Sequence, residues 1–274
     1  MTLATLSDVL QPALTGGYAV AGLVCLGWED MRAYVAAAEA EGVAVILQVG
    51  PGCRAHTPLP VLAAMLRHLG DGAGVPVVVH LDHGTAEECR QALDCGFTSV
   101  MFDGSLMDLA RNIEATARVA AMAHAAGVSC EGELGVVGYA GGAASVGTNP
   151  GEAAQFVTAT GVDALAVSVG NVHLQQGSGG RLDEARIAAI GARTRVPLVI
   201  HGGSGVPLDQ RRRLARATTV CKFNIGTELR MVFGQALRAA VARDATRFDR
   251  IEILREVHDP LAQATRLVLR NLMA

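Results

Sequence analysis

Three histidines stand just past three separate apolar runs, in VVVHLDHG (77–84), AVSVGNVH (166–173) and LVIHGGSG (198–205). They are His83, His173 and His201. A divalent metal is commonly bound by neutral imidazoles from several rigid elements, with one coordination position left open for substrate. A single histidine of this kind more often packs in a loop. Three of them at successive strand ends predict a metal site.

Carboxylates accompany the histidines. Asp82 precedes His83 and points to the opposite side of the strand end, where it could carry a proton to or from a substrate or hold a histidine tautomer. Asp103, in MFDGS, and Glu133, in EGELG, could ligate a second or displaced cation, or be hydrogen-bonded structure. His80 shares a strand face with Asp82, so we expect it inside the fold rather than as a ligand.

Two glycine-rich segments, HGGSG (201–205) and NIGT (224–227), end apolar runs and precede helices. Backbone N–H groups at such a helix start bind phosphate. Glycine allows close approach of the backbone, and hydroxyl groups add hydrogen bonds. The predicted phosphate-binding residues are Gly202, Gly203, Ser204, Asn224, Ile225, Gly226 and Thr227. Lys222 lies inside the preceding run and could face the interior; a Schiff-base role for it has no separate support.

Eight apolar, strand-like runs alternate with helical segments that end in glycine; the runs are 18–24, 43–49, 75–81, 97–102, 128–134, 162–169, 196–202 and 218–225. This alternation predicts an α/β fold, the (β/α)₈ TIM barrel, with an open doubly wound sheet as the alternative. Residues 227–271 indicate two helices, so the barrel has an extra C-terminal helix. Because chemistry in a barrel lies at the carboxyl ends of the strands, the fold would bring the polar residues together.

The bulk composition bounds the rest. A length of 274 residues fits one barrel, so we expect residues 1–274 to form a single domain. The net charge of −3 has no basic stripe for nucleic acid, and the apolar stretches are shorter than the roughly 20 residues of a membrane helix. The N-terminus shows no secretion signal, and six cysteines without a CxxC pair suit a reducing cytoplasm. We expect a cytoplasmic protein.

The motifs HLDHG, SVMFDGS, EGELG, GVDALAVSVGNVH, LVIHGGSGVP and KFNIGTELR resemble, in this order, those of the class II ketose-bisphosphate aldolases. That family includes fructose- and tagatose-bisphosphate aldolases and the phosphoketogluconate aldolase of inositol breakdown. The resemblance runs from about Val75 to Arg230. The segment AEECRQALDCGFTSVMFDGS (86–105) is most similar to the inositol branch.

The resemblance implies Zn²⁺ (or Co²⁺ or Mn²⁺) on the three histidines, with Asp82 as proton donor. It places Asp103 and Glu133 at a second metal location and a Na⁺ or K⁺ ion near the phosphate segments. The implied reaction is reversible cleavage of a phosphorylated ketose or ketogluconate, through a zinc-stabilised enediolate, to dihydroxyacetone phosphate or a related fragment and an aldehyde. A homodimer or homotetramer is also implied. The apolar LVLRNLM helix (267–273) could pack on a neighbouring subunit or on its own core.

Three departures from the family pattern concern proton transfer and sugar recognition. Val24 stands where a substrate-contacting Asn is expected, and Leu174 replaces a Gly. Residues 135–150 contain no carboxylate where the family has an acidic mobile loop. Loss of a general base costs about 10²–10⁴-fold in rate. We therefore expect either a changed substrate with another base, such as Glu131, or a weak aldolase. The alternatives are a metal-dependent isomerase or epimerase and a non-catalytic sugar-phosphate binder.

Overall fold

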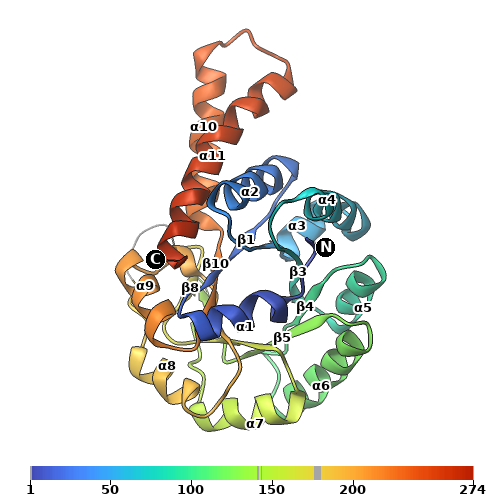
Figure 1. Ribbon diagram of the computed structural model, residues 1–274, viewed down its shortest axis with the longest axis vertical. Coiled ribbons are helices and arrows are strands. Elements are labelled where there is room, and N and C mark those ends of the chain that lie inside the picture. Colours follow the sequence, from blue (N-terminus) through green and yellow to red (C-terminus); the bar gives the residue numbers. More distant parts are fainter. Residues whose placement is uncertain (1, 141, 143, 176–179, 274) are drawn as a thin grey trace.

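Eight parallel strands close into a barrel in the computed structural model, which describes residues 2–140, 142, 144–175 and 180–273 (Figure 1). The strand order is β1-β10-β9-β7-β5-β4-β3-β2. The predicted (β/α)₈ barrel is thus confirmed and the open sheet is excluded. The barrel strands are β1 (Val20–Val24), β2 (Val45–Val49), β3 (Val77–Gly84), β4 (Ser99–Phe102), β5 (Ser129–Leu134), β7 (Ala164–Val167), β9 (Leu198–Ile200) and β10 (Val220–Ile225).

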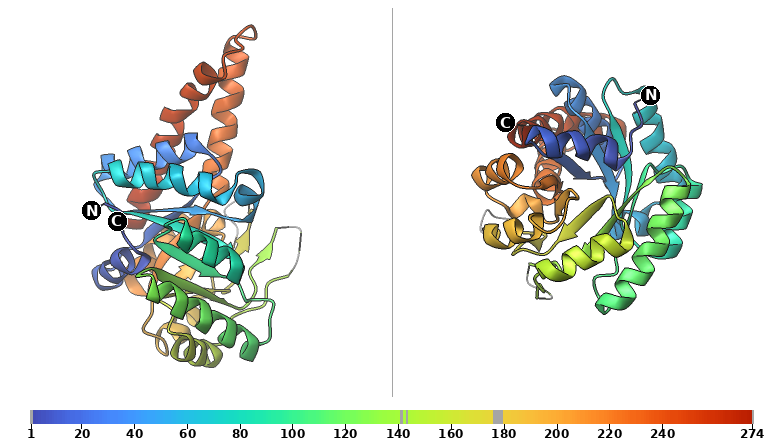
Figure 2. Two further views of the ribbon diagram at one scale, coloured as in Figure 1. Left: turned by 90° about the vertical axis from the view of Figure 1, so that its right-hand side faces the viewer. Right: turned by 60° about the horizontal axis from the view of Figure 1, so that its bottom comes forward.

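Helices cover the outside of the barrel (Figure 2). Several begin with a side-chain cap: Thr5 and Asp8, and likewise Thr85 and Glu88, form reciprocal capping boxes. The helices are α1 (Leu6–Gly16), α2 (Trp28–Glu41), α3 (Pro51–His56), α4 (Leu59–Gly72), α5 (Ala86–Asp94), α6 (Leu109–Ala125), α7 (Pro150–Thr160), α8 (Glu184–Gly191), α9 (Leu208–Ala217), α10 (Thr227–Arg243), α11 (Arg250–Met273) and the 3₁₀ turn η1 (Gly203–Gly205).

The two-residue period of the strands separates two cores. On β3, Val77, Val79 and Leu81 belong to the shell between strands and helices, whereas Val78 lies in a second apolar cluster inside the barrel. Alternation places His80 and Asp82 on the same inward face as Val78. The barrel interior is therefore apolar near the amino ends of the strands and polar toward their carboxyl ends.

Helix α1 closes the amino end of the barrel, a feature that the sequence analysis missed. Its buried residues Leu6, Val9, Leu10 and Ala13 share one apolar cluster with interior residues such as Val78. In Figure 1 the helix lies across the barrel. The carboxyl end, where the polar residues lie, is thus left as the open end.

The predicted pair of C-terminal helices is present and forms a hairpin that projects from the barrel (Figures 1 and 2). Helix α11 packs on α2, where Glu41 lies 2.5 Å from Arg266 and 2.7 Å from Arg270. The LVLRNLM segment mainly joins this chain's own core, because Val268, Leu269 and Leu272 are buried. The far end of the hairpin exposes the side chain of Phe248 almost fully.

The structure also describes the state of the cysteines and the character of the helices. The cysteines Cys25, Cys53, Cys89, Cys95, Cys130 and Cys221 are all free thiols, and five of them are buried. Burial raises the pKa of the thiols of Cys53, Cys89 and Cys221 above the usual value, so these groups stay protonated at neutral pH. Among the described residues, the helices lack the length and apolarity needed to span a lipid bilayer.

Candidate active site

The three histidines converge at the carboxyl end of the barrel. Their ring centroids are 4.7 Å apart for His83 and His201, 5.4 Å for His83 and His173, and 5.7 Å for His173 and His201. One donor atom from each lies within 4.8 Å of the others. His201 directly follows β9, as expected.

The other two histidines are placed differently from the prediction. His83 lies inside β3, which continues to Gly84, with a positive φ of 51°. His173 lies in a separate two-residue strand, β8 (Val172–His173), which pairs with β6 (Gly138–Tyr139) outside the barrel. The loop that follows β7 thus forms its own small sheet with the loop that follows β5, and this pairing brings His173 to the other histidines.

Two carboxylates surround His83. Its Nδ1 lies 2.7 Å from Asp103 Oδ2 and 3.5 Å from Glu133 Oε2. Burial lowers the pKa of His83, but the charge of Asp82 and the hydrogen bond to Asp103 outweigh it and raise the pKa to about 10. Burial raises the pKa of Glu133 to about 7. One possible donor atom from each of His83, Asp103 and Glu133 lies within 4.8 Å of the others, and His83 is hydrogen-bonded to Asp103, so these residues are a second candidate group for a cation as well as a hydrogen-bonded cluster.

Two buried polar atoms beside the histidine cluster are available to bind a cation. Nδ1 of His201 and Oε2 of Glu133 are buried, lack a hydrogen-bond partner and lie 3.9 Å apart. A buried polar atom without a partner is costly unless it binds something. Burial together with the neighbouring His201 and His83 lowers the pKa of His173 to about 3, which favours the neutral, ligating form. Three imidazoles with donor atoms within 4.8 Å of one another fit the nitrogen donor set of zinc.

A buried ion pair between Glu131 and Lys222 contacts the ring of His201. Glu131 Oε1 lies 3.2 Å from His201 Nε2, and Lys222 Nζ donates to Glu131 Oε2 at 2.7 Å. Both side chains of this ion pair are fully buried. Burial raises the pKa of Glu131, but Lys222 outweighs this effect and lowers it, so Glu131 is ionised. The contact with Glu131 leaves Nδ1 of His201 directed at the cluster.

These contacts correct two ideas from the sequence. Glu131 is not placed to replace a missing base, because both of its oxygens are occupied and it does not line the cavity. Lys222 is equally engaged and has no access for a Schiff base. His80 is the interior residue that we expected: its Nδ1 lies 2.8 Å from Ser99 Oγ, and burial lowers its pKa to about 3.

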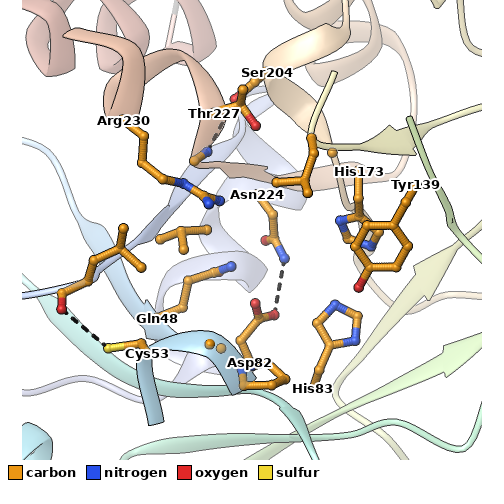
Figure 3. A pocket seen from close by; sticks show the side chains of 18 residues that line it. Gln48, Cys53, Asp82, His83, Tyr139, His173, Ser204, Asn224, Thr227 and Arg230 are labelled. Carbon is orange, nitrogen blue, oxygen red and sulfur yellow. Dashed lines mark hydrogen bonds between the residues drawn. The ribbon is translucent and has the colours of Figure 1, made fainter. Parts of the chain in front are cut away.

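Asp82 faces the cavity beside the histidines (Figure 3). Asn224 Nδ2 donates to Asp82 Oδ1 at 3.3 Å. Burial raises the pKa of Asp82, but the charges of His83 and His201 outweigh it and lower the pKa. The backbone here is fixed by Arg54, whose guanidinium donates to the carbonyl oxygens of Asp82 at 2.7 Å and His83 at 2.9 Å. Asp82 is thus an ionised, oriented carboxylate at the cavity wall.

The two glycine-rich segments meet at the start of α10. Ser204 Oγ accepts hydrogen bonds from the backbone N–H groups of Gly226 at 3.2 Å and Glu228 at 3.3 Å. Gly202 has a φ of 64°, and a Cβ there would lie 2.2 Å from the carbonyl oxygen of Val172. Only glycine fits that position. A helix N-terminus joined to a tight turn is a suitable anion site.

The predicted phosphate-binding residues do not all reach the cavity. Gly202, Ser204, Asn224, Gly226 and Thr227 line it. Gly203 and Ile225 are buried and absent from the described lining, and the side chain of Ile225 belongs to the apolar core. Their contribution is to shape the two turns rather than to offer a side chain to a ligand.

Gln48, Arg230 and Tyr139 also line the cavity, although the sequence analysis gave them no role (Figure 3). Both amide atoms of Gln48 are buried without a partner, as is Nε of Arg230. Tyr139 stacks on His173, with ring centroids 4.9 Å apart. A polar residue inside the apolar run VAVILQV was an available signal for Gln48, whereas Arg230 and Tyr139 depend on how their elements lie in space.

The departures from the family pattern lie at the same cavity. Val24 and Leu174 both line it. Leu174 has a φ of 58°. Among the described residues, Leu174 and His83 are the two non-glycine residues with a positive φ. Residues 141 and 143 of the carboxylate-free loop lie outside the described part of the chain. From the described part of this loop, Tyr139 lines the cavity.

Comparisons with known proteins identify the family of this chain. The family model described as fructose-bisphosphate aldolase class-II matches residues 4–274, and the chain belongs to that family of aldehyde-lyases. It is 37% identical to a fructose-bisphosphate aldolase of Geobacillus stearothermophilus, over 93% of this chain and 91% of that protein. It is also 37% identical to a 6-phospho-5-dehydro-2-deoxy-D-gluconate aldolase of Shouchella clausii, over 93% and 89% of the two chains. The crystal structure of the YdjI aldolase from Escherichia coli K12 has a TM-score of 0.86 and 29% identity, and covers 98% of this chain and 97% of that one.

Proposed function

We propose that this chain is a zinc-dependent aldolase that reversibly cleaves a phosphorylated ketose or ketogluconate to dihydroxyacetone phosphate, or a related fragment, and an aldehyde. The observation that carries the proposal is the convergence of His83, His173 and His201 beside Asp82, at a cavity that is also lined by glycine-rich turns suited to an anion. A metal centre beside a phosphate site is what the cleavage of a sugar phosphate requires.

The metal would be held by the three histidines, with Asp103 and Glu133 as an alternative position around His83. When bound, the ion supplies Lewis acidity that stabilises negative charge on the ketose oxygens. Glu131 keeps His201 oriented, since its contact to Nε2 leaves Nδ1 free for the cluster.

Residues of the chain would transfer the proton and bind the charged groups of the substrate. As the C–C bond breaks, Asp82 takes the proton from the hydroxyl group on the carbon that becomes the aldehyde, and it returns this proton in the direction of synthesis. The start of α10, with Gly202 and Ser204, binds the phosphate of the three-carbon fragment. Arg230 lies in the same cavity with its Nε unpaired, and it would bind a negative charge on the aldehyde fragment.

The test is a cleavage assay with the zinc-loaded protein. The substrates are fructose 1,6-bisphosphate, tagatose 1,6-bisphosphate and 6-phospho-5-dehydro-2-deoxy-D-gluconate, the last named for the relative in Shouchella clausii. Release of a three-carbon fragment from one sugar, abolished by EDTA and restored by zinc, supports the proposal. Rearrangement of the sugar without a three-carbon product would instead indicate an isomerase or epimerase.

A second candidate, a sugar-phosphate binder without turnover, is favoured by one observation: residues 135–150 contain no carboxylate. Such a protein would keep the metal cluster and the anion site and lack proton transfer at carbon. It predicts that these sugar phosphates raise the melting temperature of the zinc-loaded protein while no product forms. Turnover of any of the three sugars excludes it.

We also propose that the chain folds as one domain over residues 1–274 and assembles into a homodimer or homotetramer. The projecting hairpin supports assembly, since Phe248 is 94% exposed and Ile251 63% exposed near its far end. Exposed apolar residues that cluster together are typical of interfaces. Light scattering of the purified protein measures the mass, and a mass equal to that of the monomer would contradict the assembly.

A further inference from the structure

The cavity differs in chemistry between its floor and its rim. The floor consists of Asp82, His83, His173, Gln48 and Asn224, and the fully buried His201 lies next to both histidines. The rim carries large apolar side chains that remain open to solvent: Leu26 is 42% exposed, Leu174 47% and Tyr139 51%. Partly buried Val24 joins them in the lining. Four apolar side chains thus surround the approach to a polar floor.

Leu174 is the most informative of the four. Its φ of 58° lies in the left-handed region, which a residue with a β-carbon adopts only at an energetic cost. The side chain recovers little of that cost by packing, because nearly half of it is exposed. Backbone strain that persists without a packing reason is concentrated at ligand sites.

Scattered exposed apolar residues need no explanation, but a group at one cavity does. These residues come from three parts of the chain: Val24 at the end of β1 with Leu26 just after it, Tyr139 in β6, and Leu174 next to β8. They meet only because the loops at the carboxyl end of the barrel converge on the same cavity. Their common position therefore points to a ligand surface.

We propose that Val24, Leu26, Tyr139 and Leu174 select an aldehyde fragment that carries few hydroxyl groups. This inference rests on the proposed aldolase function. A hydroxyl group pressed against Val24, Leu26, Leu174 or the ring carbons of Tyr139 would lose water without gaining a hydrogen bond, whereas an apolar carbon gains from burial. Gln48 and Arg230 line the same cavity and can bind polar or charged groups of the aldehyde fragment. The proposed selection against hydroxyl groups therefore concerns the carbons between the reacting carbonyl and a charged group at the other end of that fragment.

The experiment runs the reaction in the direction of synthesis. Zinc-loaded protein and dihydroxyacetone phosphate are combined with propanal, 2-hydroxypropanal or glyceraldehyde, three aldehydes of equal chain length that differ only in hydroxyl groups. We expect kcat/KM to fall with each added hydroxyl group, by about 10- to 100-fold across the series, the range in which an apolar pocket discriminates against a hydroxyl group.

Two variants locate the selection. Leu174→Gly removes the strained side chain, and Val24→Asn adds a hydrogen-bonding group; each should narrow the preference for propanal by about tenfold. Leu267→Ala is the matched control, since it removes an exposed leucine on α11 that does not line the cavity and should keep the wild-type preference. Thermal unfolding confirms that each variant is folded.

A separate measurement distinguishes failure of this inference from failure of the aldolase proposal. Metal-dependent exchange of a carbon-bound proton of dihydroxyacetone phosphate with deuterium from the solvent reports the donor half of the reaction without any aldehyde. Normal exchange with equal rates for all three aldehydes, or with glyceraldehyde preferred, overturns the apolar selection and leaves the aldolase standing. Absence of both exchange and addition overturns the proposed function, and the selection with it.

Discussion

The floor and the rim of the cavity are built in different ways. Most floor side chains stand on barrel strands, as Asp82 does on β3 and Asn224 on β10, where Asn224 donates a hydrogen bond to Asp82. Three of the four rim side chains lie outside the barrel strands and are about half exposed, and one of these, Leu174, has a disfavoured backbone conformation. The floor thus contains the groups that a sugar-phosphate lyase needs in general. The rim is where this chain departs from its family, and so it is where substrate choice would be set.

The largest effect should follow from changing the proton carrier on the floor. Asp82→Asn keeps the shape of the side chain and removes its charge, so we expect kcat for cleavage to fall by about 10²–10⁴-fold. Zinc content should stay at the wild-type level, because Asp82 is not one of the clustered ligands. A kcat close to that of the wild type would assign proton transfer to another group.

Breaking the buried ion pair should damage both stability and metal binding. Glu131→Gln leaves Lys222 buried without a counter-charge, which costs about 3–5 kcal/mol in the free energy of unfolding. It also releases His201 Nε2, and loss of such a support weakens metal affinity by about 10–100-fold. Denaturant unfolding and competitive zinc titration measure the two effects.

The double variant Glu131→Gln with Lys222→Met separates the effect on stability from the effect on zinc affinity. Removing both charges should restore part of the stability, since no buried charge remains unpaired. Zinc affinity should stay weak, because His201 still lacks its partner. Recovery of full zinc affinity in the double variant would show that Glu131 acts only on folding.

The anion site should show an intermediate effect on substrate binding. Ser204→Ala removes the hydroxyl that joins the two glycine-rich turns at the start of α10. A hydrogen bond to a charged group contributes about 1.5–3 kcal/mol, so KM should rise about tenfold or more. Thr158→Ala, an exposed hydroxyl on α7, is the control. An unchanged KM would place the phosphate elsewhere.

The smallest expected effect is on stability, and it tests whether the backbone at Leu174 is strained. Leu174→Gly relieves a strain of about 1–3 kcal/mol and adds about 0.5–1 kcal/mol of backbone entropy cost, so the free energy of unfolding should rise by roughly 1 kcal/mol. Leu174→Ala keeps the β-carbon and should not gain this stability. Denaturant unfolding compares the two. A Leu174→Gly variant less stable than Leu174→Ala would show that the backbone is not strained.

Local pattern was sufficient for the features that follow from strand periodicity. Apolar runs predicted the barrel, and the end of the run LVI predicted that His201 directly follows a strand. Helix α1 was missed because it stands outside the strand-helix repeat and contains Pro12, although its capping box was readable. The short β6–β8 sheet was missed because two-residue strands have no periodicity.

Roles that depend on contacts across the barrel could not be predicted. Glu131 and Glu133 are two residues apart on β5, so they share one face of the strand. Only the position of Lys222, on the distant strand β10, decides that Glu131 is a support and not a free base. The positive φ of Leu174 likewise follows from the loop's path, although the family's glycine at that position hinted at it.

The metal cluster is the central claim, and anomalous diffraction at the zinc absorption edge tests it most directly. Crystals of zinc-loaded protein should show one strong peak about 2.0–2.1 Å from a nitrogen of each of His83, His173 and His201, with an open side toward the cavity. A peak held instead by Asp103 and Glu133 with His83 would identify the alternative position. Absence of any peak at these residues would contradict the account.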